Sequence, residues 1–479
     1  DTEYPGQFFD INVLSTYGFQ MRVVDDDPTA PWTKLTVGGW YNRTGFRGDA
    51  SRKRNPAFPV LDRVEYALDQ EFGGTHTLTA TTDGASASSG ARVMSTFGEQ
   101  DEAHVNLGAD FRYVNQFLRE DFSVTGPISP GDSPVWFTNM PRAWMTDPGV
   151  YAEWSKPLTD VWTVMVGARA DFVATYATVN ELITDPNSGS TFDPDSLWLT
   201  DVLWAIYLNN QLKLNECWTL SLGGGQGQRP PTLIERYADG LFLSLAQSGF
   251  TRMIGDPNLK PERDWQLDAG LTAEYERFRG KASFFYAWVQ DYVTWQDDTV
   301  AVPAFADARL LRFVNTDVAI LTGCDLVGEF YLWPRLTPFA KLSYVYGKDV
   351  GINAPLPAIP PLESTVGLRL HDADKGRRWG IEFAARMVHT QDQLGTILTQ
   401  GGAPTVIEER TPGLTVCNLR AYWNYTEKLN LIAGIDNVFD RNYQEHLDLR
   451  LLGPTGFPAD PTRVWAPGFT PYFGLSWIY

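Results

Sequence analysis

The sequence lacks a long apolar run and is poor in basic residues and cysteine. No stretch approaches the roughly 18 to 20 apolar residues that a membrane-spanning helix needs, so any membrane crossing would have to be made by strands. Lys and Arg number 39 against 58 Asp and Glu, a net charge of −19. That balance argues against nucleic-acid binding, which depends on basic side chains at phosphates. The three cysteines lack any C-x-x-C pair, and we expect each to lie singly on a strand: Cys217, Cys324 and Cys417.

Motifs of enzymes and metal sites are missing as well. The sequence has no H-E-x-x-H and no G-x-S-x-G, and no G-K-S/T follows the glycine-rich stretch 223–227. The five histidines are scattered, and we predict no catalytic, cofactor-binding or metal-binding residue. A copper site would need ligands from separate loops, namely Met140, Met145, His389 and His446. Acidic loop residues are expected to be solvated: Asp297, Asp298, Glu408 and Glu409.

The sequence is rich in aromatic residues and in stretches where apolar and polar residues alternate. It contains 17 Trp, 20 Tyr and 27 Phe, and membrane barrels concentrate aromatic residues at both water interfaces. In the last stretch, 469–479, every second residue back from the end is apolar: Tyr479, Trp477, Leu475 and Phe473. The same period of two returns in 104–113, 162–172 and 265–275, each time with a polar opposite face. Strands of this length and pattern predict an all-β, antiparallel transmembrane barrel with a polar lumen.

The alternation divides the chain into about 17 strands joined by short and long connections in turn. We expect strands near 8–24, 34–47, 76–98, 104–118, 149–157, 161–178, 197–211, 213–226, 262–276, 279–296, 310–333, 336–348, 362–371, 377–389, 413–425, 428–439 and 469–479. The long connections are 48–74, 119–148, 180–196, 226–261, 297–309, 349–361, 389–412 and 441–468. Membrane barrels place short turns in the periplasm and long loops outside.

An odd strand count is unexpected in a bacterial barrel, whose two ends both lie in the periplasm. The chain starts at Asp1 without a signal sequence, so we interpret it as mature or truncated. The strand 469–479 should pair with the strand 428–439 and have an open edge on its other side.

Five ordered motifs resemble those of TonB-dependent outer-membrane receptors. R-P-P-T-L-I-E at 229–235 and G-D-P-N-L-K-P-E at 255–262 are similar to two loop motifs of that family. F-V-N at 313–315 with Gly323, then G-I-D-N-V-F-D at 434–440 with Tyr443, resemble two of its strand motifs. The aromatic end of the chain is the fifth match. The motifs that carry the resemblance lie within residues 229–479. The front half resembles the family only in its pattern of strands.

This resemblance implies a 22-stranded barrel filled by an amino-terminal plug domain. We therefore expect residues 1–479 to be one barrel domain of about 17 strands, truncated at its amino end, with the plug and first strands absent. The implied function is import of a scarce solute across the bacterial outer membrane, with a ferric siderophore first and haem, cobalamin, another metal chelate or an oligosaccharide as the alternatives. The implied partners are outer-membrane lipid and, through the plug, the TonB complex, with the receptor a monomer.

Candidate residues come from the motifs. Arg229 and Glu235 could face the ligand or plug, or could instead form a hydrogen-bonded pair that fixes their own loop. The other motif residues are expected to be structural: Pro230, Asn258, Pro261, Glu262, Asn315, Gly323, Asp436, Asn437, Phe439, Asp440, Tyr443 and Tyr479. A passive porin-like channel is the alternative function, and a barrel enzyme is a third class.

Overall fold

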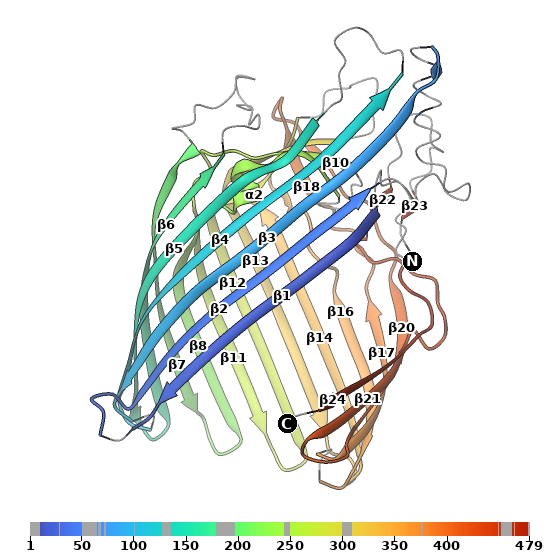
Figure 1. The fold of residues 1–479 in the computed structure, drawn as a ribbon. Helices are drawn as coiled ribbons and strands as arrows, with labels where there is room; N and C mark the ends of the chain where they lie inside the picture. Colours follow the sequence, from blue (N-terminus) through green and yellow to red (C-terminus); the bar gives the residue numbers. More distant parts are fainter. Residues whose placement is uncertain are drawn as a thin grey trace.

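The computed structural model describes residues 10–27, 29–49, 65, 69–70, 73–99, 101–126, 136–178, 197–243, 250–298, 309–374, 377–448, 450–451, 462–463 and 465–477. Long tilted strands form the wall of a barrel (Figure 1). One sheet of 22 strands contains the whole wall, and a separate two-stranded sheet joins β22 (Arg450–Leu451) to β23 (Thr462–Arg463). The predicted all-β barrel is thereby confirmed.

The wall consists of long strands, each antiparallel to the next long strand in the chain. They are β1 (Asp10–Asp25), β2 (Lys34–Asp49), β3 (Thr77–Phe97), β4 (His104–Thr125), β5 (Trp136–Thr159), β6 (Trp162–Ala177), β7 (Leu199–Lys213), β8 (Trp218–Arg229), β11 (Glu262–Glu274), β12 (Phe278–Asp297), β13 (Arg309–Phe330), β14 (Leu336–Asp349), β16 (Glu363–His371), β17 (Trp379–Val388), β20 (Leu414–Asn424), β21 (Leu429–Asp436) and β24 (Thr470–Trp477). These seventeen strands of the described residues agree with the predicted count.

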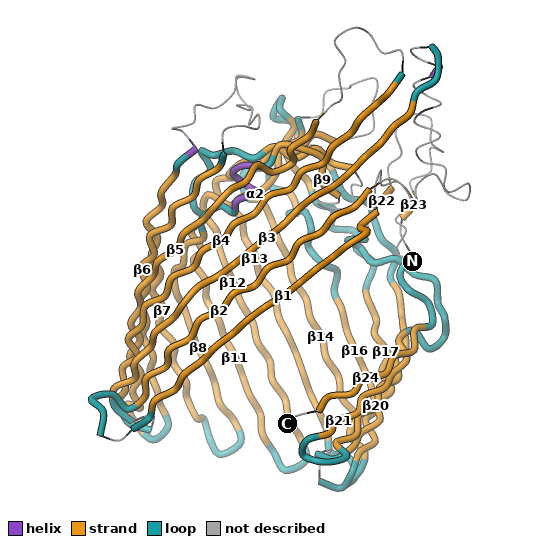
Figure 2. The backbone as a smooth tube through the Cα atoms, in the orientation of Figure 1, coloured by secondary structure: helices purple, strands orange, loops and turns teal. Residues whose placement is uncertain are grey.

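Five short strands come from the long connections and complete the sheet. They are β9 (Asp239–Leu243), β10 (Phe250–Ile254), β15 (Ala354–Pro355), β18 (Thr396–Thr399) and β19 (Pro404–Val406). A one-turn helix, α2 (Leu233–Tyr237), lies in the connection between β8 and β11. Figure 2 shows the described loops and turns in teal, with the short turns gathered at one end of the wall.

The two faces of the wall differ as the alternation predicts. On β7, Val202, Trp204 and Ile206 expose 74%, 47% and 48% of their surface on the outer face. On the inner face of β6, Arg169 pairs with Asp110 of β4 at 2.8 Å and with Asp171 at 2.5 Å. Apolar side chains outside and paired charges inside fit a wall between lipid and a polar lumen.

One predicted loop is wrong in part. The stretch 119–148 was expected to be a long connection, but β4 continues to Thr125 and β5 begins at Trp136. Its prolines and polar residues are typical of a loop, yet Ala143 and Met145 of this stretch are buried in a cluster with Leu233 and Tyr237 of α2. The contact that extends the strand therefore comes from about ninety residues later in the chain and leaves no local signal.

The wall has two edges among the described residues. There β1 pairs only with β2, and β24 pairs only with β21. Figure 1 shows β1 and β24 at the two edges of the sheet. On β24, Phe473, Leu475 and Trp477 expose 71%, 60% and 63% of their surface, while Tyr479 lies outside the described residues. No helix in the described part of the chain is long and apolar enough to cross a membrane.

Candidate gate at the mouth of the barrel

The end of the barrel that carries the long connections, called the mouth here, holds a six-stranded sheet. Its order is β9, β10, β13, β12, β18, β19. The ends of β12 and β13 extend beyond their wall neighbours, since β11 pairs with β12 only as far as Gln290 and β14 pairs with β13 only from Ala319. The free edges then accept β10 and β18 in parallel. We call this sheet, together with α2, the roof.

The roof joins the wall at a cluster of charges around Arg229, which we call the rim junction. The Arg229 guanidinium donates to Glu262 Oε2 at 2.6 Å and to both Glu235 carboxylate oxygens at 2.9 and 3.2 Å. Glu235 also accepts from Thr232 N at 2.7 Å and completes a capping box that starts α2. The second Glu262 oxygen accepts from Val293 N at 2.7 Å. One arginine thus ties β8, α2, β11 and β12 together.

Next to the rim junction, Asn315 of β13 connects the stretch before β11 to β12. Its side chain accepts from Lys260 N at 2.9 Å and donates to Lys260 O at 3.1 Å and Asp291 O at 2.6 Å. Asp291 has a left-handed backbone, with φ of 54°, and its carboxylate pairs with Arg263 at 2.6 Å. Pro230 and Pro261 flank the connection between β8 and β11, and Asn258 lies in a turn closed by Asp256 at 2.8 Å. Two motifs far apart in the chain therefore meet at one place.

Inside the mouth, α2 is fixed to the inner wall by a buried arginine. Arg236 is 2% exposed, and its guanidinium donates to Asp201 Oδ2 at 2.6 Å and Thr175 Oγ1 at 2.7 Å. The Tyr237 hydroxyl bonds Thr175 at 2.9 Å and Leu197 O at 3.0 Å. Burial raises the pKa of Tyr237 to about 12, which keeps its hydroxyl protonated as a donor. Figure 1 places α2 within the ring of strands.

On the other side of the mouth, a buried glutamate joins the connections. Glu408 is 4% exposed and accepts from Ala358 N at 2.6 Å and from Gly395 N at 2.7 Å. His446 Nε2 lies 3.4 Å from Glu408, and His446 Nδ1 lies 3.0 Å from Thr411 Oγ1. The connections after β14, β17 and β21 meet at this carboxylate.

Two of the acidic loop residues expected in solvent are therefore buried. Asp298, 4% exposed, pairs with Arg312 at 2.6 Å, and Glu408 has the partners just described. Tertiary contacts provide cations and backbone donors that adjacent residues in the sequence do not. Of the considered copper ligands, Met140 and Met145 are packed in the cluster against α2, and His446 bonds Thr411 and lies 3.4 Å from Glu408. The described residues contain no group of three His, Cys, Asp or Glu that could hold a metal.

The motif at 434–443 forms the turn that leads from β21 toward β24. Asn437 has φ of 53°, is 2% exposed, and bonds Arg441 through both its amide oxygen and its amide nitrogen at 2.8 Å. Asp440, also left-handed at φ of 51°, accepts from Phe469 N at 2.8 Å.

The remaining motif residues lie around this turn and in the wall. Asp436 lies 3.5 Å from Arg420, Tyr443 packs on the cluster of Val388, Leu414 and Val416, and Phe439 is 69% exposed. In β13, a Cβ on Gly323 would lie 2.5 Å from Tyr344 O and 2.6 Å from Phe285 Cε1. The geometry of these motif residues fits the structural roles expected of them, and those roles stay predictions.

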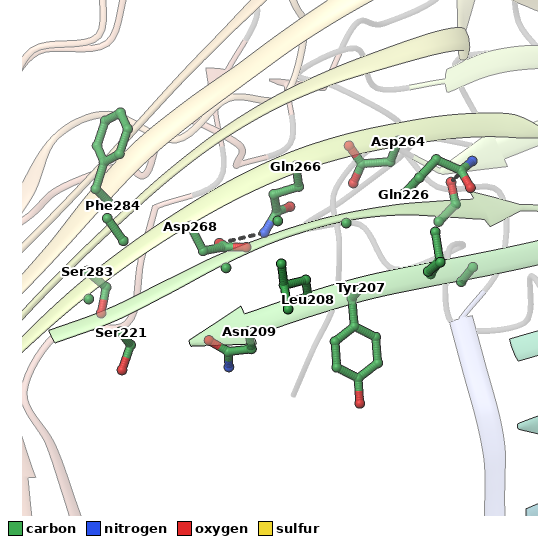
Figure 3. Close-up of a pocket in the computed structure, with 18 of the residues that line it drawn as sticks. Tyr207, Leu208, Asn209, Ser221, Gln226, Asp264, Gln266, Asp268, Ser283 and Phe284 are labelled. Atoms are coloured by element: carbon green, nitrogen blue, oxygen red, sulfur yellow. Dashed lines mark hydrogen bonds between the residues drawn. The ribbon is translucent and has the colours of Figure 1, made fainter. Parts of the chain in front are cut away.

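Below the rim junction, the inner wall has a groove of about 600 Å³. Three glycines at alternate positions of β8, Gly223, Gly225 and Gly227, leave its floor without side chains. Figure 3 shows Asn209 of β7 and Gln266 and Asp268 of β11 on either side, with a hydrogen bond of 2.7 Å from Gln266 to Asp268. The glycine stretch is thus part of a lumen wall, as its place at a strand end suggests.

Comparison with protein families identifies the class of this wall and its roof. The model described as TonB dependent receptor-like, beta-barrel, matches residues 3–438. The chain belongs to the family of TonB-dependent receptor β-barrels. No curated protein matches the chain.

Solved structures share the fold at low identity. The copper transporter OprC is 20% identical with a TM-score of 0.75, over 99% of this chain and 67% of that one. The iron transporter FrpB from Neisseria meningitidis is 15% identical with a TM-score of 0.60, over 96% and 63%. The ferric yersiniabactin uptake receptor FyuA from Yersinia pestis is 13% identical with a TM-score of 0.56, over 97% and 61%. This chain spans less than two thirds of FrpB and FyuA.

Sequence reasoning singled out Arg229, Glu235, Glu262 and Asn315. It missed Arg236 and Tyr237 and expected Glu408 to be solvated. Arg236 and Tyr237 directly follow the first motif. Their position next to Glu235 could have marked them as residues that fix the same loop. Glu408 had no comparable signal, because its partners come from connections that only the fold brings together.

Proposed function

We propose that this chain is the barrel of an outer-membrane receptor that imports a scarce solute with energy delivered through TonB. The observation that carries this proposal is a wall of the receptor family whose long connections form a sheet at the mouth. Structured connections at the mouth suit a transporter that binds its solute before admitting it, whereas an open pore would pass small solutes continuously.

A metal chelate, with a ferric siderophore first, is the proposed solute. The printed names of the structural neighbours support this class, since they include a copper transporter, an iron transporter and a ferric yersiniabactin receptor. The passive-channel alternative gains no support from these comparisons, and the proposal includes no enzymatic activity.

We further propose that the barrel is completed by strands outside this sequence, and that a plug domain in the same polypeptide contacts TonB. The two unpaired wall edges of the described residues, on β1 and β24, support the first part, because exposed strand edges are normally paired or covered. The receptor is proposed to act as a monomer in outer-membrane lipid. A coding sequence for a plug ahead of Asp1 is the expected finding in the gene.

An uptake experiment tests the proposal. A strain without the receptor gene is complemented with the complete gene and supplied with ⁵⁵Fe as ferric hydroxamate, catecholate and citrate chelates, and with copper. We expect the gene to restore uptake of at least one chelate and deletion of TonB to abolish it. Uptake that persists without TonB would instead indicate a passive channel. Unchanged uptake of every iron chelate would reject the siderophore.

A further inference from the structure

Exposed arginines gather on the outer face of the wall near the mouth. They lie on β2, β4 and β5, and we call them the arginine patch: Arg43, Arg47, Arg119 and Arg142. Figure 1 shows β2, β3, β4 and β5 side by side across the front of the wall. On β4, Val114 is buried in the inner cluster that contains Leu233 of α2, so Asn115 and every second residue after it point outward. The patch therefore lies on the face of the wall that carries the exposed apolar residues.

One row of the patch contains a carboxylate between two arginines. Asp83 of β3 is paired in register with Arg47 of β2 on one side and with Arg119 of β4 on the other. The Arg47 guanidinium lies 3.3 Å from the Asp83 carboxylate, and the two side chains are 78% and 49% exposed. The next outward row toward the short turns contains Gly45 and Ala85. These small residues leave room over the sheet for a group from another molecule.

The other two arginines have no carboxylate partner among the described residues. Arg43 is paired in register with Ala87. The Arg142 guanidinium donates to Asn115 Oδ1 at 3.4 Å and lies 4.4 Å from the centre of the Phe117 ring. No ion pair of the described residues includes Arg43 or Arg142. Unpaired guanidinium groups are donors that fit phosphate, which accepts two parallel N–H bonds from one arginine.

Acidic residues of this outer face lie on the mouth side of the unpaired Arg43. The register places Asp49 and Asp121 one outward row closer to the mouth than Asp83. Asp49 accepts from Asn12 Nδ2 at 2.6 Å. The side of the patch that faces the short turns, and with them the apolar band of the wall, is therefore the cationic side.

An aromatic row beside the patch marks the edge of the apolar band. Trp144, two residues from Arg142 on β5, stacks on Tyr176 of β6 with 5.5 Å between ring centres, and Tyr176 lies 5.6 Å from Trp198. Farther from the mouth the outer face is apolar, with Val150 of β5 59% exposed. Membrane barrels place aromatic rows where hydrocarbon gives way to lipid headgroups. Arg142, on the mouth side of Trp144, is therefore at the level of the headgroups.

We propose that the arginine patch binds the phosphate groups of a phosphorylated lipid in the outer leaflet of the membrane. This inference rests on the proposed location of the barrel in the outer membrane and assigns a lipid partner to its outer face. An arginine that faces hydrocarbon is costly unless its guanidinium reaches a headgroup or an anion, and a lipid phosphate supplies both. The adjacent aromatic and apolar surface would contact the acyl chains of a lipid, whereas a free phosphate ion would make no use of it.

Lipid binding to the complete receptor, purified in a non-ionic detergent, tests the proposal. Native mass spectrometry measures the affinity for diphosphorylated lipid A, a glycolipid with the required chemistry. The variant Arg43→Gln with Arg142→Gln removes the two cations that have no ion pair among the described residues. Its matched control, Arg377→Gln with Arg378→Gln, removes two exposed arginines from a turn at the other end of the wall.

We expect the variant without Arg43 and Arg142 to bind lipid A about 30-fold more weakly than the wild type, since each basic residue near anionic headgroups contributes a factor of about five. The control variant should bind as tightly as the wild type. Equal affinity of the wild type and the variant without Arg43 and Arg142 would overturn the proposal.

A second comparison uses the wild type alone and changes the lipid. The wild type should lose most of its affinity when both phosphates are removed from lipid A, because the guanidinium groups then have no anion to bind. Equal affinity for the two lipids would also overturn the proposal, and a folding defect cannot imitate this result because no residue is changed. Neither TonB nor an imported solute is present, so lipid binding can fail while chelate uptake succeeds, and the reverse.

Discussion

The wall and the roof of this barrel are held together in different ways. In the wall, each long strand pairs with the next long strand in the chain, and the pattern of apolar and polar residues alternates along it. In the roof, β10 and β18 pair in parallel with strands that are distant in sequence. The charges differ too, since the Arg169 side chain of the wall is 32% exposed to the lumen but Arg236 of the roof is 2% exposed. The wall therefore depends on repeated local pairing and the roof on a few buried polar contacts.

The largest expected effect is at the buried arginine of the roof. Replacing the buried Arg236 with Met leaves the Asp201 carboxylate, 12% exposed, without its cation, and we expect the roof to lose about 3 kcal/mol of stability. Hydrogen exchange of the Gly255 N–H, which bonds Ala238 O at 2.6 Å, should accelerate. The double variant Arg236→Met with Asp201→Leu should recover much of the loss, because it removes the charge left behind. Equal exchange in the wild type and the single variant would contradict this role.

A charge introduced on the outer face of the wall should destabilise the barrel, whereas a charge on the inner face should not. Leu267 is 54% exposed on the outer face of β11, and Leu267→Arg should cost about 2 to 4 kcal/mol in a membrane. Gln266→Arg, one residue away and facing the lumen, should change stability little. Urea unfolding in lipid vesicles measures both. Similar losses in the two variants would mean that the assigned faces are wrong.

The rim junction should show an intermediate effect. Glu262→Gln keeps an oxygen for Val293 N but removes the charge paired with Arg229, and we expect a loss of about 1.5 to 3 kcal/mol. Hydrogen exchange should accelerate in the roof and stay unchanged in the wall. Glu274→Gln, at the other end of the same strand, is the matched control. If Glu274→Gln lowered the free energy of unfolding by the same amount, the rim junction would have no special role in stability.

The smallest effect is expected at a turn on the opposite end of the wall. Backbone N–H groups of Trp379, Arg378 and Asp374 bond Asp372 and lower its pKa from 3.8. Because the folded pKa is lowered, the stabilisation is present above pH 3.8 and is lost as the pH falls through the folded pKa. In the Asp372→Asn variant, the free energy of unfolding should change less with pH in this acid range than it does in the wild type. An unchanged profile would show that this turn does not contribute.

The sequence alone determined the wall. The outer face of β7, with Val202, Trp204 and Ile206, and the turns that follow each strand can be predicted because the signal, a period of two, lies within one strand. The motif residues Arg229, Glu235, Glu262 and Asn315 were also identified from the sequence. Their pattern did not show that Arg229, Glu235 and Glu262 meet at one rim junction, or that Asn315 bonds the Lys260 backbone beside it.

Only the tertiary structure decided the roof. The extension of β5 before Pro148, the burial of Glu408 and Asp298, and the pairing of Arg236 with Asp201 depend on partners from distant parts of the chain. Such contacts form because buried charges must find partners once the wall has brought the connections together. A local pattern can specify a strand and its two faces, but it cannot specify which distant group will pair with a charge at the mouth.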